Sequence, residues 1–166
     1  MAETVQQRQD TVNRSARAEA RTPAGDAFSQ LVVQVFQLDG LLAAAGDALA
    51  KPAGQTSARW RVLAALEDGP ATVSHIARAW GLARQSVQRV ADALVQEGWA
   101  VYEENPGHRR AQLLRLTPRG RRALGTIQAA QRSWANALGA RIGEADLRQA
   151  SSVLQRVWQA LRAGTG

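Results

Sequence analysis

The sequence predicts a mainly α-helical protein whose centre is a winged helix-turn-helix, in which short helices precede a small β-hairpin, the wing. Three observations predict this class. Apolar residues recur at helical spacing along most of the chain. Gly81 separates a short helical segment from a longer one, as the turn of a helix-turn-helix requires. Two strand-like segments follow, and the turn between them carries Arg109 and Arg110.

The N-terminal part is predicted to hold a tail and one long helix. Residues 1–24 are polar, with few large apolar side chains, and are expected to form a mobile tail. Residues 25–51 are expected to form an N-terminal dimerisation helix, because apolar residues repeat at steps of three and four from Phe28 to Leu49. The apolar surface is wide enough for one stripe to face the domain and another to face a second subunit.

Residues 56–117 are predicted to form the winged helix-turn-helix. Thr56 is expected to cap a helix over about residues 57–67, and Thr72 to cap a short helix over residues 72–80. In each case a hydroxyl stands directly before a segment with helical periodicity.

The longer helix is expected over about residues 83–96, with apolar residues on one face and Gly98 at its end. Residues 99–104 and 112–116 read as the two strands of the wing, joined through Asn105–Pro106–Gly107.

Residues 118–163 are predicted to form C-terminal dimerisation helices. Thr117 and Pro118 are typical of a helix start, and a break is expected at Ile142–Gly143. The arginines that open the first of these helices carry charge that its dipole disfavours, so they are expected either to contact DNA backbone or to be solvated.

The amino-acid composition limits the kinds of binding partner and site that this protein can have. The formal net charge is +7, which favours a polyanion partner. Cysteine is absent, which excludes disulfides, thiolate metal sites and a thiol redox switch. No run of 18 or more apolar residues is present, so no membrane span is expected. The polar N-terminus does not read as a signal peptide, so a cytoplasmic protein is expected.

The longer helix carries the side chains expected to read DNA bases. A helix fits the major groove, and residues near its N-terminus contact base edges. Arginine pairs with guanine and glutamine with adenine. The predicted base-reading residues are Arg84, Gln85, Ser86, Gln88 and Arg89. Taken alone, this helix could equally be an amphipathic helix with an ordinary solvent-exposed face. Its position before an arginine-tipped hairpin favours a role in DNA binding.

The wing carries His108, Arg109 and Arg110 at or beside its tip. An arginine on a thin hairpin can enter a narrow minor groove, where the potential is most negative. Either Arg109 or Arg110 could make this contact. The alternative is an ordinary solvated turn.

These segments together resemble the MarR family of bacterial transcription regulators, over about residues 26–163. The matching segments are Thr56 to Trp60, Val73 to Gly81, Arg84 to Arg89, Gln96–Glu97–Gly98, Arg109–Arg110–Ala111 and Leu116–Thr117–Pro118–Arg119–Gly120. Asn105 and His108 stand where the family usually has acidic residues that brace the wing arginines. Ala83 replaces the serine that often starts the reading helix, which predicts a weaker N-cap.

The resemblance implies a nucleoid-associated homodimeric repressor without cofactor or metal, bound to a pseudo-palindromic operator with half-sites about 10 bp apart. It also implies a small aromatic effector bound between the dimer helices and the DNA-binding lobe. The candidate lining residues are Phe36, Trp60, Arg61 and Trp80.

Three other functions compete with sequence-specific DNA reading. A winged-helix module that binds protein would present a neutral or apolar front on the reading helix, unlike Arg84 to Arg89. A non-specific DNA binder without effector also remains an alternative. An enzyme is not expected, because His75 and His108 are the only histidines and no nucleophile or phosphate-loop motif accompanies them.

Overall fold

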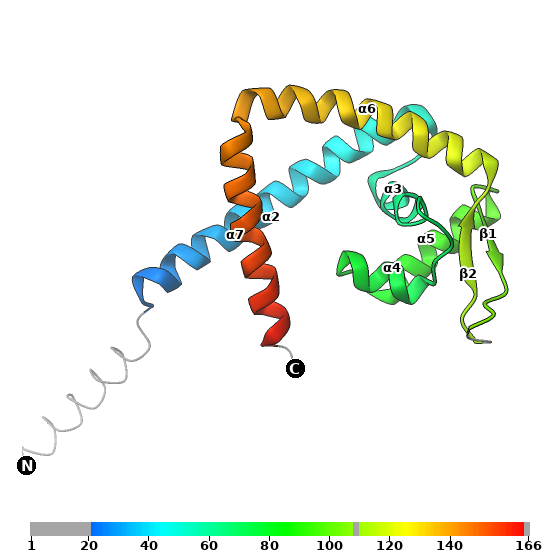
Figure 1. Ribbon diagram of the computed structural model, residues 1–166, viewed down its shortest axis with the longest axis horizontal. Coiled ribbons are helices and arrows are strands. Elements are labelled where there is room, and N and C mark those ends of the chain that lie inside the picture. Colours follow the sequence, from blue (N-terminus) through cyan, green and yellow to red (C-terminus); the bar gives the residue numbers. More distant parts are fainter. Residues whose placement is uncertain (1–20, 108–109, 165–166) are drawn as a thin grey trace, which may run out of the picture. The chain divides into compact units, whose positions relative to one another are not determined.

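A computed structural model describes residues 21–107 and 110–164 (Figure 1). The chain divides between Leu42 and Ala43 into two compact units. Helix α2 (Pro23–Ala50) begins in the first unit and ends in the second.

In the N-terminal unit, α2 begins earlier than the sequence suggested. The Thr22 hydroxyl accepts a hydrogen bond from the Gly25 amide at 3.1 Å, and Pro23 occupies the first helical position. Pro23 and Ala24 therefore belong to the helix, which corrects the expected tail over residues 1–24; residues 1–20 lie outside the described part. Most large apolar side chains of this unit are exposed: Phe28, Val33, Val35, Phe36, Leu38, Leu41 and Leu42.

By length and composition alone, the segment Pro23–Ala53 could cross a membrane. It contains no uninterrupted apolar run of about 18 residues, because Gln30, Gln34 and Asp39 lie within it. A helix that packs its apolar surface against another protein chain meets the same two criteria, so the observation by itself carries no membrane assignment.

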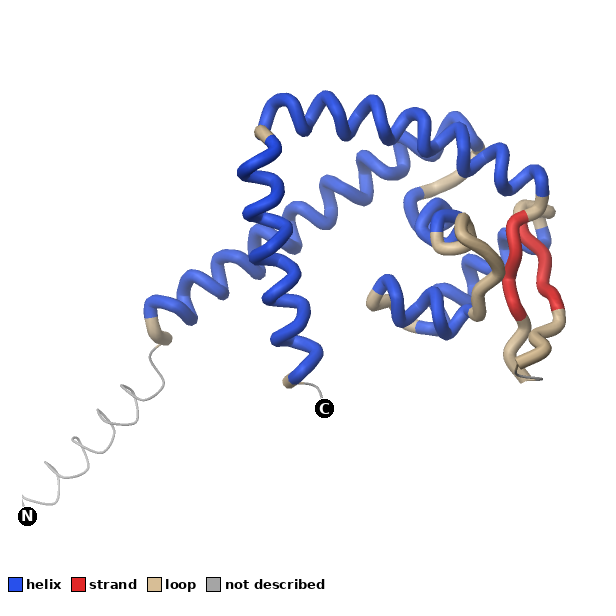
Figure 2. Tube along the Cα trace, in the orientation of Figure 1, coloured by secondary structure: helices blue, strands red, loops and turns tan. Residues whose placement is uncertain are grey.

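The second unit contains the predicted winged helix-turn-helix and two C-terminal helices (Figures 1 and 2). Its elements after α2 are η1 (Lys51–Ala53), α3 (Ser57–Ala64), α4 (Val73–Trp80), α5 (Arg84–Gln96), β1 (Ala100–Glu103), β2 (Leu113–Leu116), α6 (Pro118–Ile142) and α7 (Glu144–Ala163). The order and type of these elements confirm the predicted fold class.

The predicted helix caps are present. The hydroxyls of Thr56, Thr72 and Thr117 each accept a hydrogen bond from the amide three residues further on. Gly81, with φ of 63°, and Gly98, with φ of 75°, follow α4 and α5 in the left-handed conformation that ends a helix. Helix α3 stops at Ala64, earlier than expected.

The wing is an antiparallel hairpin in which Ala100 pairs with Leu116 and Glu103 with Leu113. A further bridge was not predicted: Ala71, in the loop before α4, exchanges two backbone hydrogen bonds with Leu114 at 3.0 and 2.9 Å. This bridge ties the wing to the start of α4 as well as to the end of α5.

The core lies where α3, α4 and α5 meet the hairpin. Its largest fully buried side chains include Leu63, Ile76, Leu94 and Leu114. The predicted apolar face of α5 is confirmed, because Val87, Ala91 and Leu94 are buried. Helices α3, α4 and α5 and the hairpin thus form one packed body that can present α5 rigidly.

Helix α6 is attached to this body at its first turn. The Thr117 hydroxyl donates towards the carbonyl oxygens of Gly98 and Trp99 at 2.9 and 3.1 Å. Arg119 donates to the Glu97 carbonyl at 2.8 Å, and its guanidinium lies 3.7 Å from the centre of the Trp99 ring. Arg119 therefore contacts Glu97 and Trp99 within the protein. The sequence had suggested either a DNA backbone contact or a solvated side chain.

Glu97 extends the same junction to α3. Its carboxylate pairs with the Arg59 guanidinium and accepts a hydrogen bond from the Trp99 ring nitrogen at 3.1 Å. The hydrogen bonds from Arg59 and then from Trp99 lower the pKa of Glu97 below its ordinary value.

Helix α7 turns away from α6 at Gly143, which has a φ of 98° (Figure 1). No residue of α7 is buried, although the helix is amphipathic. Its exposed large apolar side chains are Leu147, Leu154, Trp158 and Leu161.

Candidate nucleic-acid interface

Helix α5 presents most of the predicted base-reading side chains to solvent. Arg84, Gln85 and Arg89 are exposed, and Ser86 is half-buried on the flank of the helix. Arg89 lies 3.5 Å from the Ser86 hydroxyl. Successive helical residues are about 100° apart, so Gln85 and Arg89 lie on the side opposite the buried Val87. These two residues face outward most directly.

The start of α5 has no side-chain cap. Its N-cap residue, Ala83, cannot accept a hydrogen bond from the first-turn amides, as the sequence predicted. Uncapped N-terminal amides and the helix dipole favour a negatively charged ligand, such as a backbone phosphate.

Gln88 has a different environment from its neighbours. It is half-buried, and its amide nitrogen donates to the Asp92 carboxylate and to the Tyr102 hydroxyl, both at 2.9 Å. The Tyr102 hydroxyl in turn donates to the same Asp92 oxygen at 2.8 Å. The three side chains link α5 to strand β1, and we call them the helix–wing clasp. The sequence interpretation missed Asp92 and Tyr102, because only the fold brings β1 beside α5.

Burial first, and then the hydrogen bond to Asp92, raise the pKa of Tyr102 to about 12. Its hydroxyl therefore stays protonated and able to donate over the physiological range.

In the wing, the Asn105 side chain accepts a hydrogen bond from the Gly107 amide at 3.0 Å and so forms part of the turn. Arg115 of β2 pairs with Glu103 of β1 across the hairpin. This ion pair joins the two strands of the hairpin, and its carboxylate is not at Asn105 or His108, the positions where the resemblance leads one to expect acidic residues. Arg110 is exposed. His108 and Arg109 lie outside the described residues, so their predicted role is untested.

A hollow of about 130 Å³ lies between the helix-turn-helix and the wing. Its lining residues are Thr72, Val73, Ser74, Arg84, Gln88, Tyr102, Arg110, Ala111 and Gln112. Arg84 of the reading helix and Arg110 of the wing therefore border one concave surface, together with the hydroxyl-bearing start of α4. Two arginines beside helix-start hydroxyls suit phosphate or base edges better than an apolar ligand.

The four predicted effector-lining residues differ in burial and in their place in the fold. Trp60 packs against the core, Arg61 beside it on α3 is half-buried, and Trp80 at the end of α4 is 47% exposed. Phe36 lies in the N-terminal unit and is 73% exposed. Trp60 thus has a structural role, and the effector site stays a prediction.

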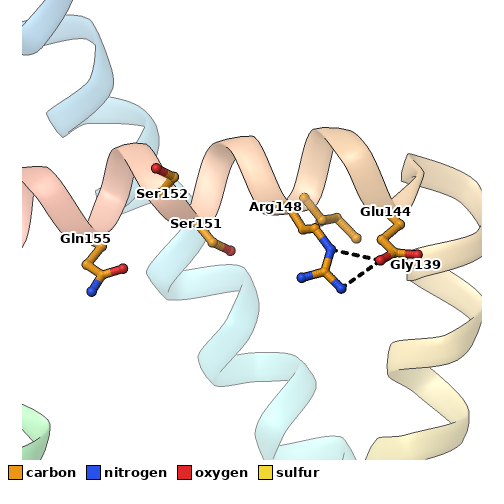
Figure 3. A pocket seen from close by; sticks show the side chains of 7 residues that line it. Gly139, Glu144, Arg148, Ser151, Ser152 and Gln155 are labelled. Atoms are coloured by element: carbon orange, nitrogen blue, oxygen red, sulfur yellow. Dashed lines mark hydrogen bonds and ion pairs between the residues drawn. The ribbon is translucent and has the colours of Figure 1, made fainter.

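A larger, open hollow of about 580 Å³ lies at the bend between α6 and α7 (Figure 3). Arg148 and Glu144, one helical turn apart on α7, pair there with an Nε–Oε1 distance of 2.8 Å. Both side chains are exposed, so the pair adds little stability. The hollow is lined by Gly139, Glu144, Leu147, Arg148, Ser151, Ser152 and Gln155.

The reading helix, the wing and the junction between them define the class of this protein, a winged helix-turn-helix protein. The chain matches the model of the MarR family over residues 53–111. It is 41% identical over 138 residues to the uncharacterized protein Rv2011c of Mycobacterium tuberculosis. The aligned region covers 83% of this chain and 96% of that protein.

Solved structures agree on the fold. The MarR family transcription regulator SP03579 has a TM-score of 0.72 and 22% identity, covering 83% of this chain and 94% of its own. The transcriptional repressor CouR bound to a 23-mer DNA duplex has a TM-score of 0.70 and 22% identity, covering 83% and 99%. CouR from Rhodococcus jostii RHA1 bound to p-coumaroyl-CoA has a TM-score of 0.69 and 20% identity, covering 76% and 90%.

The chain belongs to the MarR family. Members of this family are DNA-binding transcription regulators and not enzymes. The resemblance read from the sequence is therefore confirmed.

Proposed function

We propose that this protein is a sequence-specific repressor of transcription that binds duplex DNA as a homodimer in the bacterial cytoplasm. The observation that carries the proposal is the concave surface that Arg84 of the reading helix and Arg110 of the wing both border. In this arrangement α5 enters the major groove, and Gln85 and Arg89 contact base edges. The wing follows the backbone into the adjacent minor groove. CouR, of the same fold, is a repressor bound to DNA.

The homodimer is supported by apolar surface at both ends of the chain. Helix α7 leaves Leu147, Leu154 and Trp158 exposed, and α2 exposes a longer apolar series. Exposed apolar surface of this extent marks a protein interface, and two-fold dimers are the commonest assembly. A two-fold dimer would place two reading helices on a pseudo-palindromic operator with half-sites about 10 bp apart.

An aromatic effector that releases DNA completes the proposal. CouR, at 20% identity, binds p-coumaroyl-CoA, and Trp80 and Phe36 expose aromatic surface here. The effector would act by binding one dimer geometry better than the other. Aromatic carboxylic acids and aromatic acyl thioesters are the probes: either class should lower operator affinity, and Trp80→Ala should weaken that response. Unchanged operator affinity at saturating concentrations of both classes would count against the effector.

The deciding experiment selects binding sites from a random duplex pool and measures the affinity of the winners at two salt concentrations. Recovery of a two-fold-symmetric site, bound at least about 10³-fold better than random DNA, is expected of a specific regulator. Recovery of no motif, with affinity that disappears as salt rises, would leave a non-specific DNA binder.

Single substitutions separate base contacts from backbone contacts on the recovered site. Gln85→Ala should relax the preference at one base pair by about 1–3 kcal/mol. Arg110→Ala should weaken binding to all sequences and reduce the salt slope by about one. If Gln85→Ala lowered affinity equally for every sequence, Gln85 would not read a base.

A further inference from the structure

We propose that Gln88, Asp92 and Tyr102 act together as a clasp that holds the wing at a set position against the reading helix, so that Gln88 is a positioning residue and not a base reader. This inference rests on the proposed DNA-binding function and assigns a different role to one residue of the reading helix.

The first argument is the hydrogen bonding of Gln88. To read adenine, a glutamine side chain must donate a hydrogen to N7 while its oxygen accepts from N6. A primary amide has two hydrogens. In this structure the amide nitrogen that carries them donates to both Asp92 and Tyr102, each at 2.9 Å. The Gln88 amide nitrogen therefore already has two partners within the protein, and adenine N7 would have to compete with them.

The second argument is where Gln88 lies on α5. It is half-buried, whereas Gln85, Arg89 and Asp92 are exposed. It is on the side of the helix that faces β1 and borders the hollow between helix and wing. A base in the major groove would meet Gln85 and Arg89 before it met Gln88.

The third argument is where Tyr102 lies on the wing. It is on β1, opposite Leu114 of β2, and three residues before Asn105 at the turn. The clasp thus joins the reading helix to the hairpin on the approach to its tip. The Tyr102 ring also packs against the core, so the hydroxyl sits on a fixed support.

The single Asp92 oxygen that accepts from both partners makes the clasp cooperative. Tyr102 and Gln88 each donate to that oxygen, and Gln88 also donates to the Tyr102 hydroxyl. Loss of any one of the three side chains removes two of the three hydrogen bonds between them. The effects of two substitutions on operator affinity should therefore not add.

The test compares Gln88→Met and Tyr102→Phe with Gln85→Ala on the selected operator and on its single base-pair variants. Met keeps the length of Gln88, and Phe keeps the ring of Tyr102. Each should lower operator affinity about five- to tenfold, the factor for one ordinary hydrogen bond, while the ranking of bases at every position stays as in the wild type. Gln85→Ala should alter the ranking at one position.

The double variant Gln88→Met/Tyr102→Phe should bind about as well as either single variant. If the two losses of operator affinity multiplied in the double variant, the two residues would act independently, and the proposed clasp would be wrong. A changed base ranking for Gln88→Met at one position would show that Gln88 reads a base. Unchanged affinity for both single variants would also overturn the proposal.

Hydrogen exchange on the free protein tests the clasp without DNA. In Tyr102→Phe the amides of β1 and β2 should exchange faster, while those in the middle of α6 should not change. Equal protection of the hairpin in wild type and variant would reject the clasp. If wild type selected no operator, the proposed function would fail, and the exchange result would still decide the clasp.

Discussion

At the residue scale, Gly120 decides how closely α6 approaches the end of α5. A Cβ at this position would lie 2.0 Å from the Trp99 carbonyl oxygen and 3.1 Å from its carbon, and neither backbone atom can move aside cheaply. Glycine is therefore required here by close contact, because α6 starts directly against the backbone of Trp99.

Gly120→Ala should lower the free energy of unfolding by at least about 2 kcal/mol, because the added methyl forces α6 and Trp99 apart. Gly125→Ala is the matched control on the same helix, since a Cβ there meets no atom within 4 Å. It should be neutral or stabilising by up to about 1 kcal/mol. Urea unfolding of both variants measures the difference; equal stabilities would mean that the α6 contact is looser than described.

The buried side chain of Gln55 lowers the stability of the folded protein. Its side chain is 5% exposed, and neither its amide nitrogen nor its oxygen has a hydrogen-bond partner among the described residues. An unpaired buried polar group costs about 1–3 kcal/mol. Gln55→Leu should therefore raise the midpoint of thermal unfolding, whereas Gln96→Leu, on the exposed front of α5, should leave it nearly unchanged. A lowered midpoint for Gln55→Leu would mean that the amide has a partner in solution.

At the element scale, the contact between α5 and β1 should be visible in a titration. Tyr102 is the single tyrosine of the chain, so phenolate absorbance reports on this residue alone. Burial and then the Asp92 hydrogen bond raise its pKa from 10.0 to about 12. In the folded protein, the absorbance midpoint should therefore lie near 12, reached by rapid pH jump before unfolding.

The linked stability follows from the same shift. Because the folded state holds the Tyr102 proton more tightly than the unfolded chain, this contribution is complete below pH 10 and is lost as the pH rises from about 10 to about 12. Asp92→Asn removes the charge beside Tyr102 and should bring the midpoint down. A wild-type midpoint near 10 in the folded protein would contradict the clasp geometry.

Most elements could be predicted from local chemistry. Thr56, Thr72 and Thr117 cap helices as expected, and Gly81 and Gly98 end them, because caps and left-handed glycines act within a few residues. The start of α2 differs from the expected residue 25, because Thr22 caps the helix directly before Pro23.

At the scale of the whole molecule, we expect the exposed apolar face of α7 to support dimerisation. Leu154, 43% exposed, lies on this face. Leu154→Glu would place a charge in the proposed interface and should weaken the dimer at least about tenfold, since an unpaired buried charge is strongly disfavoured. Operator affinity should fall with it. Gln149→Glu, on another face of α7, is the charge-matched control.

Sedimentation over a range of protein concentrations measures this effect. Unchanged dimerisation for Leu154→Glu would place the dimer interface away from this part of α7. A wild-type protein that stays monomeric at all concentrations would remove the homodimer from the proposed function.

The sequence by itself determined the class of fold, the order of elements and the polar front of α5, because helix periods, caps and turn glycines are local properties. Only the tertiary structure decided which side chains meet. It paired Gln88 with Asp92 and Tyr102, stacked Arg119 on Trp99, bridged Ala71 to Leu114 and placed Arg84 and Arg110 at the border of one hollow. These contacts join residues on different elements, and their geometry depends on how the core packs the elements together rather than on the residues next to each one.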